Sequence, residues 1–249
     1  MFPYIDANHW PVQPFRLLVP VAILVGYLIG VRRLKGQCIP RERVSELALL
    51  VTLGGLLGAH LLKLVYVPGA FGAALSHPWL LFAIGNGLAS FGAFVGATAA
   101  VLIFFRHRSG TPWFIYSDAG AFAVPFAWAV GRLGCYLIHD HPGLRTNSWL
   151  GVKYPGGTRF DLGLLEMLFL LLLGCVFLLL DRRKRPRGFY CITFLLSYGS
   201  FRWGLDQLHV DPPRYFGWSV DQITSSIMIL AGIMCFIGTM RHKETHVHE

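Results

Sequence analysis

Seven continuous apolar runs constrain the fold of this chain more than any other feature. They cover about residues 15–31, 44–66, 84–105, 117–138, 161–181, 188–208 and 218–240. About 20 apolar residues suffice to cross a bilayer as a helix, and continuous rather than alternating runs argue against an outer-membrane barrel. The composition, 54% hydrophobic and 14% charged, excludes a soluble enzyme, a disordered chain and a disulfide scaffold. We predict a single all-α, polytopic membrane domain over residues 1–249, with about seven transmembrane helices.

Basic residues between the runs predict how the helices are oriented. Lys and Arg concentrate in 32–43, 106–108, 181–187 and the C-terminal tail, whereas the loops on the opposite side carry few. The positive-inside rule therefore places the N-terminus outside and the C-terminus in the cytoplasm. Loop charge also accounts for the net charge of +9, so no nucleic-acid partner is expected. The longest outer segment, 139–160, is rich in Gly and Pro and predicts a small extracytoplasmic cap.

The cysteines offer no sequence signature of a metal site. The chain has five of them, but none forms a CxxC pair or a Cys/His spacing typical of metal ligands. Three lie inside apolar runs, where a free cysteine behaves as a small hydrophobic residue. We therefore expect neither a metal nor an organic cofactor.

Polar side chains inside the apolar runs gather in the outer half of the predicted bundle. Tyr198, Arg202 and Asp206 recur every four residues and share one helix face. A buried charge costs about 2.5–3.5 kcal/mol at a helix centre, so such residues pair with one another or bind a charged ligand. The full set at this depth is His60, Lys63, Arg132, Asp140, Glu166, Tyr198, Arg202, Asp206 and Asp221.

The depth of this set indicates what it binds. A transporter normally places its polar residues near the bilayer midplane, whereas these residues lie at headgroup depth. Two arginines, Arg132 and Arg202, suit an anionic phosphate held by guanidinium forks. We therefore expect a phospholipid substrate whose tails remain in the membrane.

Two motifs carry a resemblance to a known family. Gly131-Arg132-Leu133-Gly134-Cys135-Tyr136, followed by Asp140 and Gly143, and Tyr198-Gly199-Ser200-Phe201-Arg202, followed by Asp206, resemble signatures of the prolipoprotein diacylglyceryl transferases. Supporting matches are Ser117-Asp118, Leu165-Glu166, Gly92 to Gly96 and Asp221-Gln222-Ile223. The resemblance runs in order across most of the chain.

The resemblance implies a transferase of the bacterial inner membrane. Such an enzyme moves a diacylglyceryl group from phosphatidylglycerol to the lipobox cysteine thiol of a prolipoprotein at the outer face, and glycerol phosphate leaves. Arg132 and Arg202 would hold the phosphate, and Asp206 would orient Arg202. The implied catalytic residues are Asp140, Arg202 and Asp206, and the implied substrate-binding residues are His60, Arg132, Gly134, Gly143, Glu166 and Tyr198.

Three departures from the family pattern affect the chemistry. Phe91 stands where the family has a histidine that is a candidate base, Cys135 replaces an asparagine, and His60 replaces an arginine. We therefore hypothesise that one of the histidines flanking Asp140, His139 or His141, acts as the base, with His60 as a third candidate. The change to Cys135 is interpreted as one of side-chain size.

Two other functions remain open. A divergent phospholipid-dependent transferase with a different acceptor is favoured by Phe91 and Cys135. A non-catalytic phospholipid-binding membrane protein would need the arginine pair but would not depend on His139, Asp140 or His141. Mutation of Asp140 separates an enzyme from such a binder.

Overall fold

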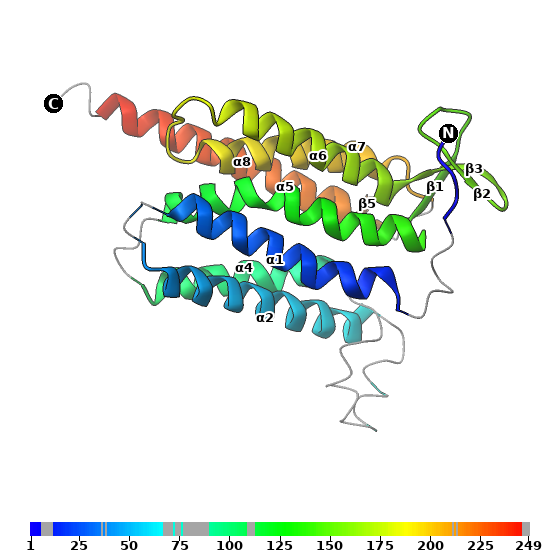
Figure 1. Ribbon diagram of the computed structural model, residues 1–249, viewed down its shortest axis with the longest axis horizontal. Helices are drawn as coiled ribbons and strands as arrows, with labels where there is room; N and C mark the ends of the chain where they lie inside the picture. Colours follow the sequence, from blue (N-terminus) through cyan, green and yellow to red (C-terminus); the bar gives the residue numbers. More distant parts are fainter. Residues whose placement is uncertain are drawn as a thin grey trace. The chain divides into compact units, whose positions relative to one another are not determined.

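A computed structural model describes residues 1–5, 12–35, 37, 39–66, 72, 76, 90–108, 113–210, 212 and 214–245 (Figure 1). Within these ranges each predicted apolar run corresponds to one helix. The helices are α1 (Pro14–Leu34), α2 (Arg41–Tyr66), α4 (Ser90–Arg106), α5 (Trp113–Ile138), α6 (Leu162–Leu180), α7 (Phe189–Asp206) and α8 (Val220–Thr245). The predicted first part of the third run, 84–89, lies outside the described residues.

Five of these helices are long and apolar enough to cross a membrane: α1, α2, α5, α6 and α8. The apolar part of α4, Val95–Arg106, is shorter, and α7 carries Arg202 and Asp206 within its 18 residues. The prediction of a mostly helical membrane protein is confirmed. The number of seven crossings stays a prediction.

The chain divides into two compact units. The first comprises Met1–Leu34 and Phe114–Glu249, and the second comprises Lys35–Trp113. The prediction of one domain over the whole chain stays a prediction.

Glycines allow α2 and α4 of the second unit to pack closely. A Cβ built at Gly58 would lie 2.2 Å from the carbonyl oxygen of Gly92, and one at Gly96 would lie 1.9 Å from that of Gly54. No other residue type fits such an approach without moving a backbone. Small residues spaced four apart are typical of close helix contacts in membranes.

Aromatic side chains fill the core of the first unit between α5, α6 and α7. The ring of Phe122 lies 5.9 Å from that of Phe177 and 5.1 Å from that of Tyr190, and Phe194 stacks on Tyr198 at 5.2 Å. By contrast, α1 and α8 bury few of their apolar residues. Apolar side chains that the protein leaves uncovered suit contact with lipid.

A small β cap follows α5, in the segment where the sequence predicts one. Strands β1 (Pro142–Arg145), β2 (Val152–Tyr154) and β3 (Gly157–Asp161) form an antiparallel sheet in the order β1-β3-β2. The N-terminus joins it, because the amide of Phe2 donates to the carbonyl of Gly151 at 2.8 Å. In Figure 1 the N-terminus lies beside the cap, at the end of the first unit away from the C-terminal end of α8.

The cap is attached to the end of the bundle where α5 ends, α6 begins and α7 ends. The amide of Leu144 donates to the carbonyl of Leu208 at 2.9 Å, and Gly143 forms an antiparallel bridge with His209. A second hairpin, β4 (Arg214–Tyr215) and β5 (Trp218–Ser219), leads into α8. The cap therefore covers the ends of the helices that carry the candidate site.

Candidate active site

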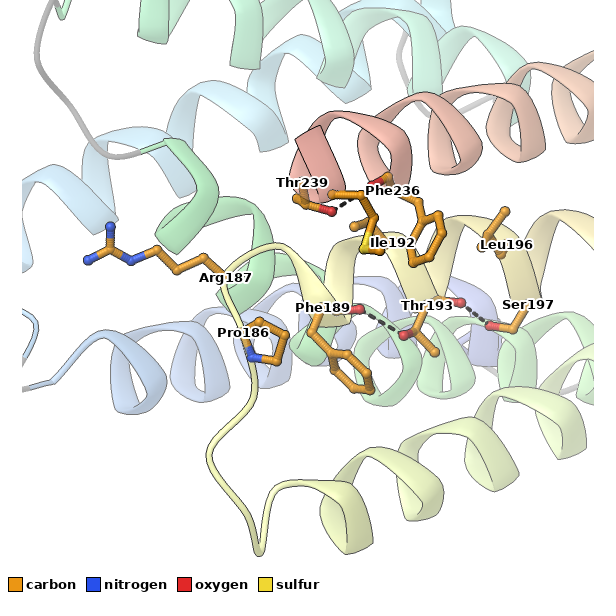
Figure 2. Close-up of a pocket in the computed structure, with 10 residues that line it drawn as sticks. Pro186, Arg187, Phe189, Ile192, Thr193, Leu196, Ser197, Phe236 and Thr239 are labelled. Atoms are coloured by element: carbon orange, nitrogen blue, oxygen red, sulfur yellow. Dashed lines mark hydrogen bonds between the residues drawn. The ribbon is translucent and has the colours of Figure 1, made fainter. Parts of the chain in front are cut away.

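The pocket between the start of α7 and the end of α8 does not hold the candidate residues (Figure 2). Its lining is apolar apart from a few side chains, and its hydroxyl groups bond their own helices. Thr193 Oγ1 donates to the carbonyl of Phe189 at 2.7 Å, and Thr239 Oγ1 donates to that of Phe236 at 2.7 Å. The hydroxyls of Thr193 and Thr239 are thus already engaged, and the candidate residues lie toward the other end of α7.

Glu166 of α6 is the centre of a buried charge cluster. Its Oε2 lies 3.0 Å from Arg132 Nη2 of α5 and 3.3 Å from Arg202 Nη1 of α7. The hydroxyl of Tyr198 donates to Oε1 at 2.6 Å. Glu166 is 1% exposed, and a carboxylate buried this deeply is tolerated only when it is paired and hydrogen-bonded. The sequence analysis placed four of these residues on three helices at one depth in the membrane. The structure brings them together: Arg132, Glu166, Tyr198 and Arg202.

Asp221, at the start of α8, is the second acid in this cluster. Its Oδ2 accepts a hydrogen bond from Arg202 Nη2 at 2.6 Å. The expected partner, Asp206, instead accepts a hydrogen bond from the hydroxyl of Ser219 at 2.7 Å. Asp206 forms no ion pair with Arg202 among the described residues, so the expectation that it orients Arg202 directly is corrected. Asp221 and Glu166 fix the guanidinium.

One edge of the Arg132 guanidinium has no oxygen partner. Its Nε is buried without a hydrogen-bond partner among the described residues, and Nη1 reaches only the sulfur of Cys135, at 3.7 Å. A buried donor that lacks an acceptor is costly. This edge is therefore suited to an anionic oxygen of a ligand.

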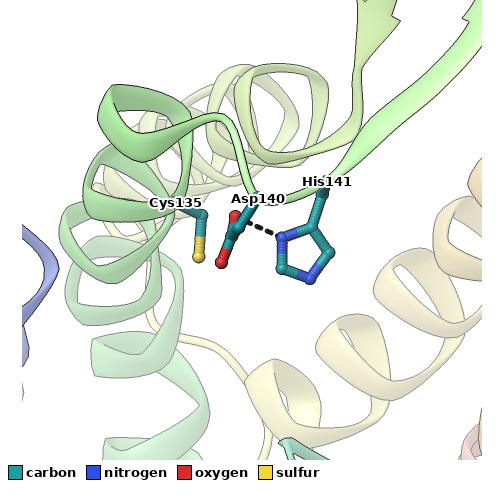
Figure 3. A group of neighbouring side chains, drawn as sticks. All are labelled: Cys135, Asp140 and His141. Atoms are coloured by element: carbon teal, nitrogen blue, oxygen red, sulfur yellow. Dashed lines mark hydrogen bonds and ion pairs between the residues drawn. The ribbon is translucent and has the colours of Figure 1, made fainter. Parts of the chain in front are cut away.

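Cys135, Asp140 and His141 form a second cluster next to Arg132 (Figure 3). Each contributes one sulfur, oxygen or nitrogen atom, and these three atoms all lie within 4.8 Å of one another. Asp140 Oδ1 and His141 Nδ1 are hydrogen-bonded. Burial alone would lower the pKa of His141, but hydrogen bonds with Asp140 and Cys135 outweigh it and raise the pKa to about 9. The cluster thus combines a buried thiol with an exposed carboxylate and an imidazole.

His139, the other histidine beside Asp140, belongs to a different network. Its Nδ1 lies 2.7 Å from Asp161 Oδ2, and its Nε2 accepts a hydrogen bond from the amide of Ile5 at 3.2 Å. Its ring stacks on Tyr4 at 4.2 Å. Both ring nitrogens are therefore engaged, and His139 ties the N-terminus to the cap.

Asp161 is a buried residue that the sequence analysis did not single out. It accepts hydrogen bonds from the amide of Leu164 at 2.9 Å and from the hydroxyl of Tyr154 at 2.7 Å, in addition to its contact with His139. Burial and the bond to Asp161 raise the pKa of Tyr154. An acid directly before an apolar run is a signal for a helix N-cap, and this signal identifies Asp161 as the cap of α6.

The two predicted glycines lie where segments approach closely. A Cβ at Gly134 would lie 3.0 Å from the Cα of Phe15, so this position lets α1 begin against α5. A Cβ at Gly143 would lie 2.8 Å from the carbonyl oxygen of Leu208, so this position lets β1 cross the end of α7. Both glycines shape the surroundings of the arginine cluster through packing.

His60 lies in α2, in the second unit. It is 4% exposed, and neither ring nitrogen has a partner among the described residues. The side chains of Lys63 and Phe91 lie outside the described residues.

Apolar helices around a buried cluster of arginines and carboxylates define a polytopic membrane protein. The family model of the prolipoprotein diacylglyceryl transferases matches residues 4–238, and the chain belongs to this family. Relatives named phosphatidylglycerol–prolipoprotein diacylglyceryl transferase include one from Geobacter sulfurreducens, 28% identical over 97% of this chain and 98% of the relative. One from Bordetella avium is 29% identical over 95% of this chain and 92% of the relative. One from Photobacterium profundum is 30% identical over 79% of this chain and 76% of the relative.

Proposed function

We propose that this protein transfers the diacylglyceryl group of phosphatidylglycerol to the lipobox cysteine thiol of prolipoproteins at the outer face of the bacterial inner membrane. The observation that carries the proposal is the buried Arg132–Glu166–Arg202 cluster, with an edge of Arg132 open to an anionic ligand. The printed names of the relatives support the donor and the acceptor.

In this proposal the arginines act on the leaving group. The thiolate sulfur attacks the glycerol carbon that bears the phosphate, the carbon–sulfur bond forms, and the carbon–oxygen bond to the phosphate breaks. Glycerol phosphate leaves with the electron pair, so the negative charge on its phosphate grows. Arg132 and Arg202 stabilise that charge from fixed positions, because Glu166 and Asp221 hold their guanidinium groups before the substrate arrives.

In this proposal the lipobox thiol of the prolipoprotein loses its proton in the region next to Cys135. Arg132 supplies a permanent positive charge there, and the Asp140–His141 pair adds hydrogen-bonding groups on the same side. A thiol ionises more readily near such groups. We therefore assign the catalytic role to Asp140 and His141 and a structural role to His139, whose ring nitrogens are both engaged.

The seven helices are proposed to cross the membrane with the N-terminus and the cap outside and the C-terminus in the cytoplasm. The distribution of Lys and Arg between the helices supports this orientation. It is consistent with the position of the arginine cluster toward the capped end of α7, because a lipobox cysteine is modified at the outer face.

The test is a reconstituted reaction with identified products. Purified protein in lipid nanodiscs receives labelled phosphatidylglycerol and a lipobox peptide, and mass spectrometry follows both products. We expect a peptide that has gained a diacylglyceryl thioether and an equal amount of glycerol phosphate. A peptide with serine in place of the lipobox cysteine is the control and stays unmodified. Donor binding without peptide modification would contradict the proposal and indicate another acceptor or a lipid-binding protein.

A further inference from the structure

We propose that Cys135, Asp140 and His141 bind a zinc ion whose fourth position takes the acceptor thiol. This inference rests on the proposed diacylglyceryl transfer and deepens it. It gives the three side chains one common role, that of ligands which hold a cation beside the arginine cluster.

The placement of the three side chains suits a metal centre. In Figure 3 the thiol of Cys135, the carboxylate of Asp140 and the imidazole of His141 converge on one space. Their ligand atoms lie within 4.8 Å of one another. Zinc–ligand bonds of about 2.0–2.3 Å in a tetrahedron bring neighbouring ligand atoms to about 3.3–3.8 Å. Side-chain movements of about 1 Å therefore suffice, and Asp140 and His141 lie on the turn that follows α5.

The chemistry of the ligands selects zinc. A thiolate, an imidazole and a carboxylate are the three ligand types that zinc accepts, whereas magnesium and calcium prefer oxygen ligands alone. Three protein ligands leave one position of the tetrahedron open, as in catalytic zinc sites. Cys135 is buried while Asp140 is exposed, so the cluster is open on the side of Asp140. A substrate group has a path to the fourth position.

Zinc would supply what the chain lacks at position 91. A thiol that coordinates zinc is deprotonated, and its proton is released to solvent. The resulting zinc-bound thiolate performs the attack described above: the sulfur–carbon bond forms, the carbon–oxygen bond breaks, and glycerol phosphate leaves with the electron pair. A chain with Phe91 at the position where the resemblance implies a histidine therefore needs no histidine base there.

The neighbouring arginine connects this cluster to the donor site. Arg132 Nη1 lies 3.7 Å from the sulfur of Cys135, while Nη2 of the same guanidinium pairs with Glu166 at 3.0 Å. A thiolate held by the cluster would therefore lie next to the guanidinium that holds the donor phosphate. Nucleophile and leaving group would be positioned by adjoining side chains.

Metal analysis of the full-length protein tests the site without reference to activity. The protein is purified in detergent from zinc-supplemented cells, freed of loose metal, and its zinc measured by mass spectrometry. We expect one zinc per chain in the wild type and in Cys175→Ser, which changes an exposed cysteine of α6. We expect its loss in Cys135→Asn, Cys135→Ser and His141→Leu. Thermal melting identifies a variant that has failed to fold. Cys135→Asn introduces the residue type that the resemblance to the family implies at this position.

Cobalt substitution tests the open position. The cobalt protein should show a thiolate-to-cobalt absorption band that is absent in Cys135→Asn. A lipobox peptide should change the cobalt spectrum, and the same peptide with serine should not. Wild-type protein without zinc, or folded Cys135 variants that keep it, would overturn the proposal. Thioether formation by zinc-free protein would overturn it and leave the proposed function intact. A peptide that binds the cobalt protein but never forms the thioether would support the metal site and contradict the proposed function.

Discussion

The guanidinium of Arg132 lies 3.0 Å from the carboxylate of Glu166, and the pair is almost completely buried. Arg202 approaches the same oxygen at 3.3 Å. The two cations thus share one anion. This arrangement links α5, α6 and α7, so the cluster that we propose as the donor site is also a structural element of the bundle.

Loss of the shared carboxylate should destabilise the protein. Glu166→Gln leaves the buried guanidinium of Arg132 and the partly buried one of Arg202 without this anion, and breaking a buried ion pair costs about 3–5 kcal/mol. The measurement is thermal unfolding in detergent. Glu46→Gln is the matched control, because both side chains of the Glu46–Arg108 pair are 38% exposed and ion pairs open to solvent contribute about 0–1 kcal/mol. Equal melting temperatures for the two variants would contradict this role of Glu166.

Asp118 of α5 caps α7 from outside that helix. Its carboxylate accepts hydrogen bonds from the amides of Gly188 at 2.6 Å and Cys191 at 3.0 Å. The N-cap residue of α7, Gly188, provides no side-chain cap itself. Asp118→Ala should therefore cost about 1–2 kcal/mol of stability and speed amide exchange at Gly188 and Cys191. Unchanged exchange in Asp118→Ala would argue against the cap.

Substitutions of the two histidines beside Asp140 should have different effects, one on stability and the other on activity. His139→Gln disturbs the buried contacts with Asp161 and Tyr4, so we expect a lower melting temperature. His141→Gln changes the partly exposed cluster beside Cys135, so we expect about a 100-fold loss of kcat with an unchanged melting temperature. The checks are calorimetry and thioether formation on both variants. Full activity of the folded His141→Gln protein would remove His141 from the mechanism.

Asp181, after the end of α6, should contribute acid-sensitive stability. Burial raises its pKa, but hydrogen bonds from Arg33, at 2.6 Å, and Tyr190 outweigh burial and lower the pKa overall. A carboxyl group whose pKa is lower in the folded state stabilises it above its unfolded pKa of about 3.9 and loses that contribution as the pH falls through the folded value. The melting-temperature difference between wild type and Asp181→Asn should be constant near neutral pH and shrink below about pH 4. A difference that grows on acidification would contradict this sign.

The sequence predicted the helices well because their main determinant is local. A continuous apolar run in a membrane has to form its backbone hydrogen bonds internally, and each predicted run corresponds to a helix. The strands of the cap were not predicted individually, because runs of three to five residues with mixed burial carry no clear period. The contribution of the N-terminal residues to the cap depends on contacts between segments far apart in the chain.

Depth and periodicity predicted which polar residues of the helices lie close together. These two signals placed Arg132, Glu166 and Arg202 together, as the structure does. The spacing of four residues favoured Asp206 as the partner of Arg202, but that spacing describes one helix, whereas Asp221 reaches Arg202 from another. The cluster of Cys135, Asp140 and His141 was missed for a related reason. Its residues come from a helix end and the following turn, where no fixed ligand spacing applies.

The most direct test of the central claim compares two arginines in the thioether assay. Arg202→Ala removes a guanidinium from the buried cluster, whereas Arg145→Ala removes an exposed one from strand β1 of the cap. Loss of a fixed group that stabilises transition-state charge costs about 100- to 1,000-fold in rate. We predict a fall of at least about 100-fold in kcat/KM for folded Arg202→Ala and little change for Arg145→Ala. Wild-type rates in folded Arg202→Ala would contradict the assignment of the buried arginines to the donor phosphate.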